Sequence, residues 1–404
     1  MSKVFKIGVF GLGHGGGAAE IFSKEFENTT VSAVCEKDQE KIETAKRYLP
    51  ADVKIFDNFD EFIKSGLDAV YLANYFSEHA KYAIKAMEAG VAVLSETTAA
   101  PTLGECVDLV ETAERTNGKY MLAANCLYFP AVHAMKPLIE KGEYGKVLYA
   151  EAEYIHGTDY MNYDEIPEAD PEDVHWRYLE PNCMYNMHTL GPLMYITGST
   201  PKKVYCKSFH TPDFSKKLKR LRDSEGSIVM TEMDNGAVFN TTGCNSYHPN
   251  SKWYRVACEH GTMETVRYDQ HEDLLHISPR GHEVKQLLFN WRTSGAAPEG
   301  FNNPNANKYG HGGIDYFMCY YFKEYLEGKI EPFLNVYRSA ALSATGILAW
   351  YSALSGKEYD VPDFTKKEDR DKIRNDYRTP FAKKPADATL PFRLDDKDKF
   401  EDLF

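Results

Sequence analysis

The chain has 404 residues, 43% of them hydrophobic and 26% charged, which is typical of a globular enzyme with two domains. Its formal net charge of −13 at pH 7 argues against a nucleic acid or an anionic membrane as a partner, and no apolar run approaches the roughly 20 residues that cross a bilayer. The first residues show no signal-peptide pattern and the eight cysteines show no CxxC or finger-like spacing, so we expect a cytoplasmic protein with reduced thiols and no metal centre.

The sequence KIGVFGLGHGGGA at residues 6–18 has the order of strand, glycine turn and helix start that is typical of a dinucleotide-binding site. In this motif Gly11 permits the tight turn, Gly13 lets the backbone approach the pyrophosphate, and Gly16 lets the helix pack close to the strand. The pyrophosphate would then lie on N–H groups at a helix N-terminus. His14, inside the loop, would either contact a phosphate or point to solvent.

A carboxylate at the end of the second strand indicates which dinucleotide binds. The strand is predicted at residues 30–36, and Glu36 lies 20 residues after Gly16, where an acid accepts hydrogen bonds from the adenosine ribose. Since a 2′-phosphate would be repelled there, Glu36 favours NAD as the cofactor, although Lys37 weakens the preference. The alternative is an acid that merely ends a strand.

Short apolar strands alternate with longer helices through residue 125, which predicts an α/β domain with a doubly wound parallel sheet at residues 1–125. The further strands of this Rossmann domain are predicted at residues 54–56, 68–73, 91–95 and 120–124, and its further helices at 38–48, 60–65, 78–89 and 103–117.

The pattern changes near Cys126 to runs of alternating strands, which predict an α+β domain with a mostly antiparallel open sheet at residues 126–360. Its strands are predicted at 147–156, 203–209, 227–232, 237–243, 253–258, 261–268 and 274–278, and its helices at 132–141, 184–197 and 314–327. A later helix at 339–355 is expected to return and pack on the first domain. The long polar loops 159–174 and 293–313 are expected to belong to a site or an interface. Residues 361–404 are predicted to form a charged surface arm.

Several stretches together resemble the Gfo/Idh/MocA oxidoreductases. They are GLGHGG, Asn74 with His79 on the next helix, GVAVLSETTAA, KPLIEKGEYGKVLYAEAEY and HWRYLEPNCMYNMHTLGPLMYITG. The resemblance implies NAD as cofactor, a carbohydrate or similar small molecule as substrate, and a second domain whose sheet often forms a homo-oligomer interface. It also implies that Asn74 and His79 lie near the nicotinamide ribose.

One motif departs from that family. Its usual Glu-Lys-Pro, whose lysine assists proton transfer at the reacting hydroxyl, is replaced here by Glu96, Thr97 and Thr98. Glu96 is still expected to hydrogen-bond near the nicotinamide. Because threonine is no general base near neutral pH, the chemistry needs another proton acceptor.

A second set of stretches is similar to family 109 glycoside hydrolases, which share this fold, hold NAD permanently and also lack the lysine. The similar stretches are residues 125–128 beginning with Asn125, Tyr154 to His156, Tyr185 to His188 with Gly191 and Pro192, and residues 310–313 with Asp315. In that family a sugar is oxidised at C3, the anomeric group is eliminated after loss of the C2 proton, water adds and the hydride returns.

Four side chains are the candidates for proton transfer. His188 is the first choice as base because it lies ten residues before Gly198, the spacing that the resembled superfamily uses, and because histidine titrates near neutral pH. Tyr185 would share its helical face, and Tyr154 would share a strand face with His156. The alternatives are a hydrogen-bonded core histidine and tyrosines that only pack.

Substrate contacts are expected from a second group of residues. Trp176 and Arg177 match a family pair whose arginine could hold a hydroxyl or a carboxylate, a structural arginine being equally compatible. His311, between glycines, would face the pocket together with Tyr309, and the resemblance adds Asn125.

Three functions remain open on these grounds. The first is an NAD-dependent oxidoreductase acting on a ring hydroxyl of a sugar or glycoside, with His188 as base. The second is a redox-neutral glycoside hydrolase or lyase with tightly bound NAD. The third is a non-catalytic NAD-binding protein, which only the missing lysine supports.

Overall fold

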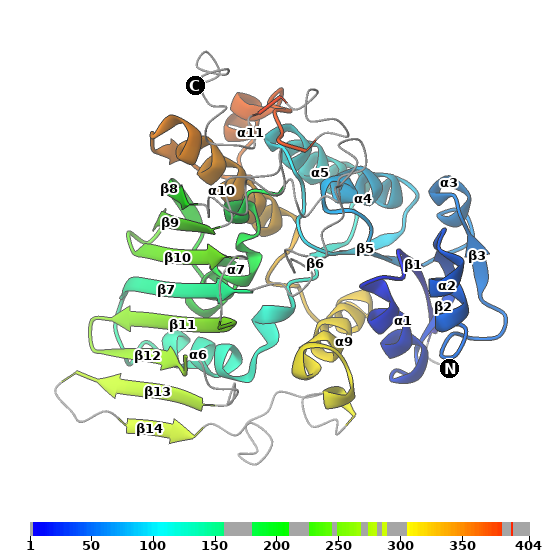
Figure 1. Cartoon of the computed structure of the whole chain (residues 1–404), viewed down its shortest axis with the longest axis horizontal. Coiled ribbons are helices and arrows are strands. Elements are labelled where there is room, and N and C mark those ends of the chain that lie inside the picture. Colours follow the sequence, from blue (N-terminus) through cyan, green and yellow to red (C-terminus); the bar gives the residue numbers. More distant parts are fainter. Residues whose placement is uncertain are drawn as a thin grey trace, which may run out of the picture. The chain divides into compact units, whose positions relative to one another are not determined.

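The computed structural model describes residues 3–156, 180–209, 226–244, 249–267, 274–280, 285–288, 305–381 and 389–390 (Figure 1). The chain divides into two compact units. The first comprises Met1–Ala100, Glu105–Tyr128 and Ala297–Ala340, and the second comprises Pro101–Gly104, Phe129–Ala296 and Ala341–Phe404. Residues 297–340 were predicted to belong to the second domain, but they are part of the first unit. Among the described residues, no helix combines the length and the apolar character that a membrane crossing requires.

The first unit is built on a six-stranded, fully parallel sheet in the order β3-β2-β1-β4-β5-β6. The strands are β1 Phe5–Phe10, β2 Thr29–Cys35, β3 Lys54–Phe56, β4 Ala69–Leu72, β5 Ala92–Ser95 and β6 Tyr120–Leu122. The central strands β4 and β5 are buried along their whole length. Continuous apolar strands of this kind are covered on both faces, as the predicted doubly wound fold requires.

Five helices of the described part of the first unit connect these strands, and α9 Ile314–Leu326 comes much later in the chain. The five are α1 Gly15–Lys24, α2 Gln39–Ala45, α3 Phe59–Phe62, α4 His79–Glu88 and α5 Leu103–Thr116. The side chain of Asp38 caps α2 by accepting hydrogen bonds from the N–H groups of Glu40 and Lys41. Helix α9 belongs to this unit because its aromatic face packs on α1, where the ring centroids of Phe22 and Phe322 lie 6.3 Å apart.

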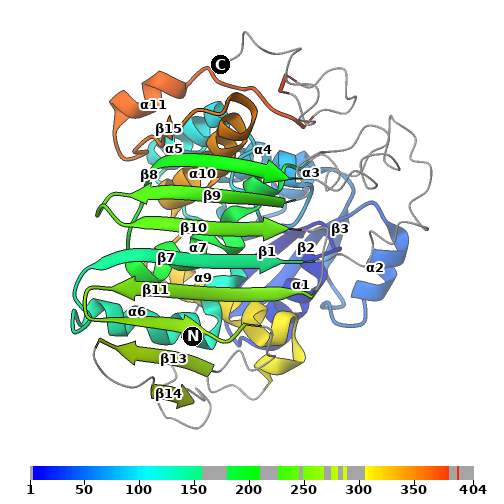
Figure 2. The same cartoon turned by 60° about the vertical axis from the view of Figure 1, so that its left-hand side comes forward.

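The second unit contains a nine-stranded sheet in the order β14-β13-β12-β11-β7-β10-β9-β8-β15, in which only β7 and β10 run parallel (Figure 2). The strands are β7 Val147–Ile155, β8 Pro201–Phe209, β9 Gly226–Met233, β10 Val238–Cys244, β11 Ser251–Cys258, β12 Gly261–Thr265, β13 Leu274–Pro279, β14 Lys285–Leu288 and β15 Tyr359–Asp360. The mostly antiparallel sheet was predicted, but β14 and β15 were not. The helices are α6 Pro130–Glu140, α7 Leu190–Thr197, α10 Val336–Ser355 and α11 Lys367–Ile373.

The helix predicted at residues 184–197 begins only at Leu190, and two short 3₁₀ turns, Asn182–Met184 and Asn186–His188, precede it. A longer helix would need a bond from the N–H of residue 192 to the carbonyl of His188. Pro192 has no N–H, and its ring would clash with that carbonyl. The prediction of a continuous helix was therefore wrong.

The predicted surface arm is also wrong for residues 361–381. Helix α11 lies in this segment, and its Arg370 is buried and donates to the carbonyl of Phe364 at 3.2 Å. Farther along, Asp376 accepts a hydrogen bond of 3.0 Å from the hydroxyl of Tyr351 on α10. The charged composition of this segment concealed the hydrogen bonds that attach it to the rest of the second unit.

Candidate functional site

The glycine loop follows β1 and has the geometry of a dinucleotide-binding turn. Gly11 has φ +90°, and a Cβ there would lie 2.5 Å from the carbonyl oxygen of Ala73. A Cβ on Gly13 would meet no atom within 4 Å, so this position leaves room for a phosphate to approach the backbone. The close helix–strand contact predicted for Gly16 is instead made by Gly15, whose Cβ would lie 2.9 Å from Val9. Gly16 leaves room for the hydroxyl of Tyr48.

Glu36 is held at the mouth of this loop. Its Oε2 accepts a hydrogen bond of 2.8 Å from the N–H of Leu12, and its Oε1 accepts bonds from the N–H groups of Lys37 and Asp38. These bonds fix the carboxylate beside the loop, where its predicted contact with the adenosine ribose remains a prediction. His14 is exposed at the N-cap of α1 and makes no capping hydrogen bond with its side chain.

His79 is buried inside the first unit. It is 1% exposed, and its Nδ1 and Nε2 lie 3.1 Å from the carbonyl oxygens of Thr98 and Asn74. Burial lowers the pKa of His79 to about 4 against the opposing effect of these carbonyls, so the neutral ring donates one hydrogen bond. His79 therefore contacts both segments that follow β4 and β5, and its expected place near the nicotinamide ribose stays a prediction.

Two orphaned oxygens at the carboxyl ends of the strands fit a dinucleotide. The Oδ1 atoms of Asn74, after β4, and of Asn125, after β6, are buried and have no hydrogen-bond partner in the part of the chain that the structure describes. The nicotinamide end of NAD carries ribose hydroxyls and an amide that donate hydrogen bonds. Since ligands of such sheets bind outside the carboxyl ends of the strands, the donor set and the acceptors match.

Glu96 is held by Tyr71, whose hydroxyl donates a hydrogen bond to Oε1 of the carboxylate. Burial raises the pKa of Glu96, the hydrogen bond from Tyr71 and the nearby His14 oppose the rise, and Asp315 adds to it. Glu96 thus shares its surroundings with the glycine loop and with the start of α9. Its expected contact with the nicotinamide remains a prediction.

Asp315 joins two of the predicted substrate residues. Its Oδ2 lies 2.8 Å from Nδ1 of His311, and its Oδ1 accepts a bond of 2.9 Å from Nδ2 of Asn125. Burial alone would raise the pKa of Asp315, but the hydrogen bonds and the charge of its neighbours, His311 above all, lower it below its ordinary range. His311 is held at φ +54°, and a Cβ on Gly310 would lie 2.4 Å from the carboxylate, so the glycines around His311 make this contact possible.

Tyr309 does not join this group. Its hydroxyl donates a hydrogen bond of 2.7 Å to Glu25 on α1, and its ring stacks on Tyr316 at a centroid distance of 6.4 Å. Burial and the bond to Glu25 raise the pKa of the Tyr309 hydroxyl. The side chain is therefore engaged with helices α1 and α9, which contradicts its predicted place beside His311.

All four predicted proton-transfer residues come together in the second unit. The ring of His188 stacks on Tyr154 with a centroid distance of 4.5 Å and an interplanar angle of 25°, and it lies 4.9 Å from the ring of Tyr185. The ring of Tyr154 also lies 5.6 Å from the ring of His156, which directly follows β7. We call Tyr154, His156, Tyr185 and His188 the ring cluster.

The turn that carries His188 is fixed by buried side chains of neighbouring elements. The hydroxyl of Tyr254, on β11, donates a hydrogen bond of 2.8 Å to the carbonyl of His188. Nδ2 of Asn186 donates to the carbonyl of Leu342 in α10 at 2.9 Å. A Cβ on Gly346 would lie 2.9 Å from Cα of Met184, so glycine lets α10 approach the turn.

Two predicted site residues lie outside the described residues, and two further residues near the site were missed by sequence reasoning. Trp176 and Arg177 lie outside the described residues, so their predicted roles stay predictions. Asp315 was noticed only as part of a motif, although its spacing of four residues from His311 across a helix start was a usable signal. Tyr254 had no sequence signal. Within the described ranges, no group of three or more potential metal ligands occurs.

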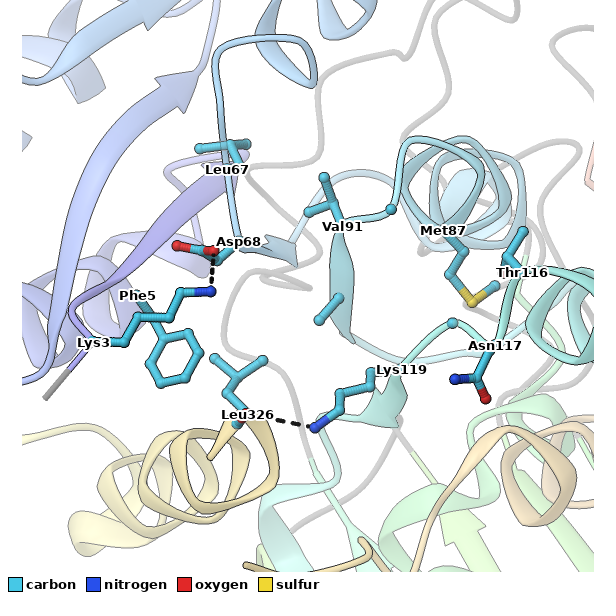
Figure 3. Close-up of a pocket in the computed structure, with 13 residues that line it drawn as sticks. Lys3, Phe5, Leu67, Asp68, Met87, Val91, Thr116, Asn117, Lys119 and Leu326 are labelled. Atoms are coloured by element: carbon cyan, nitrogen blue, oxygen red, sulfur yellow. Dashed lines mark hydrogen bonds and ion pairs between the residues drawn. The ribbon is translucent and has the colours of Figure 1, made fainter. Parts of the chain in front are cut away.

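A pocket of about 260 Å³ in the first unit lies at the opposite edge of the sheet, around the amino ends of β1, β5 and β6 (Figure 3). There Nζ of Lys3 lies 2.7 Å from Asp68, and Nζ of Lys119 donates to the carbonyl of Tyr325 at 2.6 Å. Both ammonium groups are thus engaged by the protein, and the pocket is distinct from the edge where dinucleotides bind.

Comparison with known proteins agrees with this geometry. Residues 5–124 match the oxidoreductase family with an NAD-binding Rossmann fold. A levoglucosan dehydrogenase solved with NADH and L-sorbose has the same fold, with a TM-score of 0.70, 19% identity, and coverage of 90% of this chain and 100% of that one. For myo-inositol 2-dehydrogenase from Lactobacillus plantarum the TM-score is 0.65 and the identity 18%, over 89% and 100% of the two chains. Residues 5–124 therefore form an NAD-binding domain of the Gfo/Idh/MocA oxidoreductase class.

Residues 128–370 match the C-terminal domain of glycosyl hydrolase 109, and the chain belongs to this family within that class. It is 26% identical to glycosyl hydrolase family 109 protein 1 of Bacteroides thetaiotaomicron, over 90% of this chain and 85% of that protein. It is 27% identical to the family 109 protein of Stenotrophomonas maltophilia, over 75% and 74% of the two chains.

Replacing Gly13 by alanine tests the glycine loop. Because a Cβ at Gly13 enters open space, Gly13→Ala should leave the unfolding midpoint unchanged but obstruct the pyrophosphate, raising the Kd for NAD roughly tenfold or more. Gly17→Ala is the matched control, since its Cβ also meets no atom within 4 Å. Calorimetric titration with NAD measures both, and equal affinities would exclude a close approach at Gly13.

The depressed pKa of His79 predicts a pH-dependent stability. Between pH 6.5 and about 4 the unfolded chain binds a proton on this histidine and the folded chain does not, so the free energy of unfolding should fall by about 3 kcal/mol as the pH drops through that window. Urea unfolding at a series of pH values measures the slope. In His79→Gln this contribution should disappear, and an undiminished slope would assign the dependence to other groups.

Proposed function

We propose that this protein cleaves a glycosidic bond with NAD that is reduced and reoxidised within each turnover. The ring cluster carries the proposal, because it gathers four proton-transfer groups in a chain that has Thr97 where related oxidoreductases have a lysine. The proposal is supported by the family 109 match and by the curated relatives, which are named as glycosyl hydrolases.

NAD, when bound, supplies a hydride acceptor for the carbon of a ring hydroxyl. His188 would take the proton of that hydroxyl as the hydride leaves C3, and the loss of both converts the alcohol to a ketone. The ketone makes the C2 proton acidic, and one group among Tyr154, Tyr185 and His156 would accept it. The C2–H electron pair forms a C1–C2 double bond while the bond from C1 to the leaving oxygen breaks. The leaving oxygen would take the proton that was removed from C2, and water would then add across the double bond. Return of the hydride to C3, and of the proton held by His188 to the oxygen, would restore the hydroxyl.

Substrate hydroxyls are held by the group around Asp315. His311 is oriented by the contact of its Nδ1 with the carboxylate of Asp315, so Nε2 is the ring nitrogen that we expect to hydrogen-bond a sugar hydroxyl. Asn125 is oriented by the same carboxylate. Trp176 and Arg177 complete this proposed set, as expected from the family pair.

A second candidate is a net oxidoreductase of sugars, which the NAD-binding domain and the fold shared with sugar dehydrogenases favour. The two differ in one product. Aryl glycosides incubated with the purified protein should release the aglycone with no accumulation of NADH. Accumulation of NADH in proportion to oxidised sugar would support the oxidoreductase, and neither product over a broad panel of glycosides would contradict both.

Substitution of His188 tests its role as base. His188→Gln should lower kcat by about 10²–10⁴-fold, because one general base is removed, while the amount of bound NAD stays the same. His260→Gln is the control, since His260 is an exposed histidine of the same unit. Full turnover by His188→Gln would assign the hydroxyl proton to another group.

We further propose that copies of the chain associate through the sheet of the second unit. Ile228 and Met230 on β9 and Val238 on β10 expose 46%, 47% and 43% of their surfaces. The alternate residues of the two strands, such as Val229 and Phe239, are buried. Apolar side chains grouped on adjacent strands are typical of a protein interface.

Sedimentation of charged variants tests this association. Met230→Asp should shift the wild-type oligomer to monomers, because it places a carboxylate among apolar partners. Val4→Asp, at a residue of the first unit that is 48% exposed, should leave the mass unchanged. An unaltered oligomer in Met230→Asp would locate the interface elsewhere.

The state of the cysteines supports a cytoplasmic location, which we also propose. All eight are buried and free of disulfides. Free thiols in this number are typical of proteins from a reducing compartment.

A further inference from the structure

A third orphaned oxygen lies between the two already described at the carboxyl ends of the strands. Oγ1 of Thr97, after β5, is buried and has no hydrogen-bond partner in the described ranges, and the residue is 8% exposed. Asn74 follows β4 and Asn125 follows β6, so each of three neighbouring strands is followed by one such acceptor.

Backbone hydrogen bonds place these three residues at one edge. The N–H of Glu96 donates to the carbonyl of Leu72 at 2.9 Å, and the N–H of Ala123 donates to that of Ser95 at 2.7 Å. The segments that begin at residues 73, 96 and 123 therefore leave the sheet at the same level. His79, between the carbonyls of Asn74 and Thr98, fixes the backbone on either side of this row.

A buried hydroxyl without a partner is unfavourable, and valine would fill the same volume without it. Nothing in the described protein accounts for a hydroxyl at this position. The edge is the one where a parallel sheet binds its dinucleotide, and the nicotinamide end of NAD offers hydroxyl and amide donors to an oxygen acceptor.

We propose that Thr97 is an NAD-binding residue, whose hydroxyl accepts a hydrogen bond from the nicotinamide riboside end of the cofactor in line with Asn74 and Asn125. The position that holds a proton-transfer lysine in related oxidoreductases thus serves cofactor retention in this chain. The inference depends on NAD binding and not on the reaction proposed above.

Thr97→Val in the full-length, nucleotide-free chain tests the proposal, because stability should be kept while NAD affinity is lost. Removing an unpartnered hydroxyl should leave the unfolding midpoint unchanged or raise it, while the Kd for NAD should rise about tenfold because a donor of the cofactor loses its acceptor. Calorimetric titration and thermal unfolding measure the two quantities.

Thr29→Val is the matched control, since Thr29 is a buried threonine of the same unit whose hydroxyl donates to the carbonyl of Phe22 at 2.7 Å. It should lower the unfolding midpoint and leave the Kd for NAD unchanged. Thr97→Ser, which keeps the hydroxyl, should bind NAD within about threefold of the wild type. If Thr97→Val does not fold, Thr97→Ser against Thr97→Ala makes the same comparison.

Shorter ligands locate the contact. Thr97→Val should bind AMP like the wild type, because AMP lacks the nicotinamide half. A loss with NAD but not with ADP-ribose assigns the contact to the carboxamide, and an equal loss with both assigns it to the ribose. Unchanged NAD affinity in Thr97→Val, a lowered midpoint like that of Thr29→Val, or equal weakening in the serine variant would overturn the proposal.

Discussion

The hydrogen bond from Tyr254 to the carbonyl of His188 determines where the ring cluster lies. Pro192 cannot supply the N–H that a helix would offer this carbonyl, so the chain must leave helical geometry and another donor must be found. Tyr254, buried on β11, provides it at 2.8 Å. The 3₁₀ turn that results directs the imidazole of His188 onto the ring of Tyr154.

In the first unit, too, a buried side chain contacts backbone carbonyls of irregular segments. Where β4 and β5 end, backbone carbonyls lose their partners in the sheet, and the ring of His79 lies between those of Asn74 and Thr98. In both units a buried side chain from a regular element holds a short loop that carries functional groups. Such loops keep a defined geometry because a buried side chain supplies a donor to a backbone carbonyl inside the protein, and the neutral ring of His79 can donate to one of its two carbonyls.

The sequence was sufficient for the fold class, because strand and helix periods and the glycine loop are local properties. The ring cluster was also predicted, since Tyr154 and His156 share a strand face and Tyr185 and His188 share a motif. The reason given for the second pair was wrong: the predicted helix does not exist, and contact arises from a turn whose donor, Tyr254, is 66 residues away. A bond over that separation leaves no local pattern.

Errors of detail have a similar origin. The hydroxyl of Tyr309 pairs with Glu25, 284 residues away, and α9 packs on α1, so the segment predicted for the second domain belongs to the first unit. Gly15 makes the close helix contact that was predicted for Gly16, and the helix already begins at Gly15. Only tertiary packing decides such choices.

Because Thr97 stands where related oxidoreductases have a lysine, the charge of the neighbouring Glu96 carboxylate has no ammonium group at position 97 to stabilise it. An ammonium beside Glu96 would stabilise its charge, whereas here burial raises the pKa of Glu96 and the hydroxyl of Tyr71 and the ring of His14 oppose that rise. In the proposed function, proton transfer without the lysine falls to the tyrosine and histidine rings of the ring cluster. Tyr154 and His188 are both 7% exposed, and an uncharged ring can be buried to this extent without the desolvation cost of an ammonium group. The proposed function therefore replaces one charged base by rings that contact one another, with His188 stacked on Tyr154.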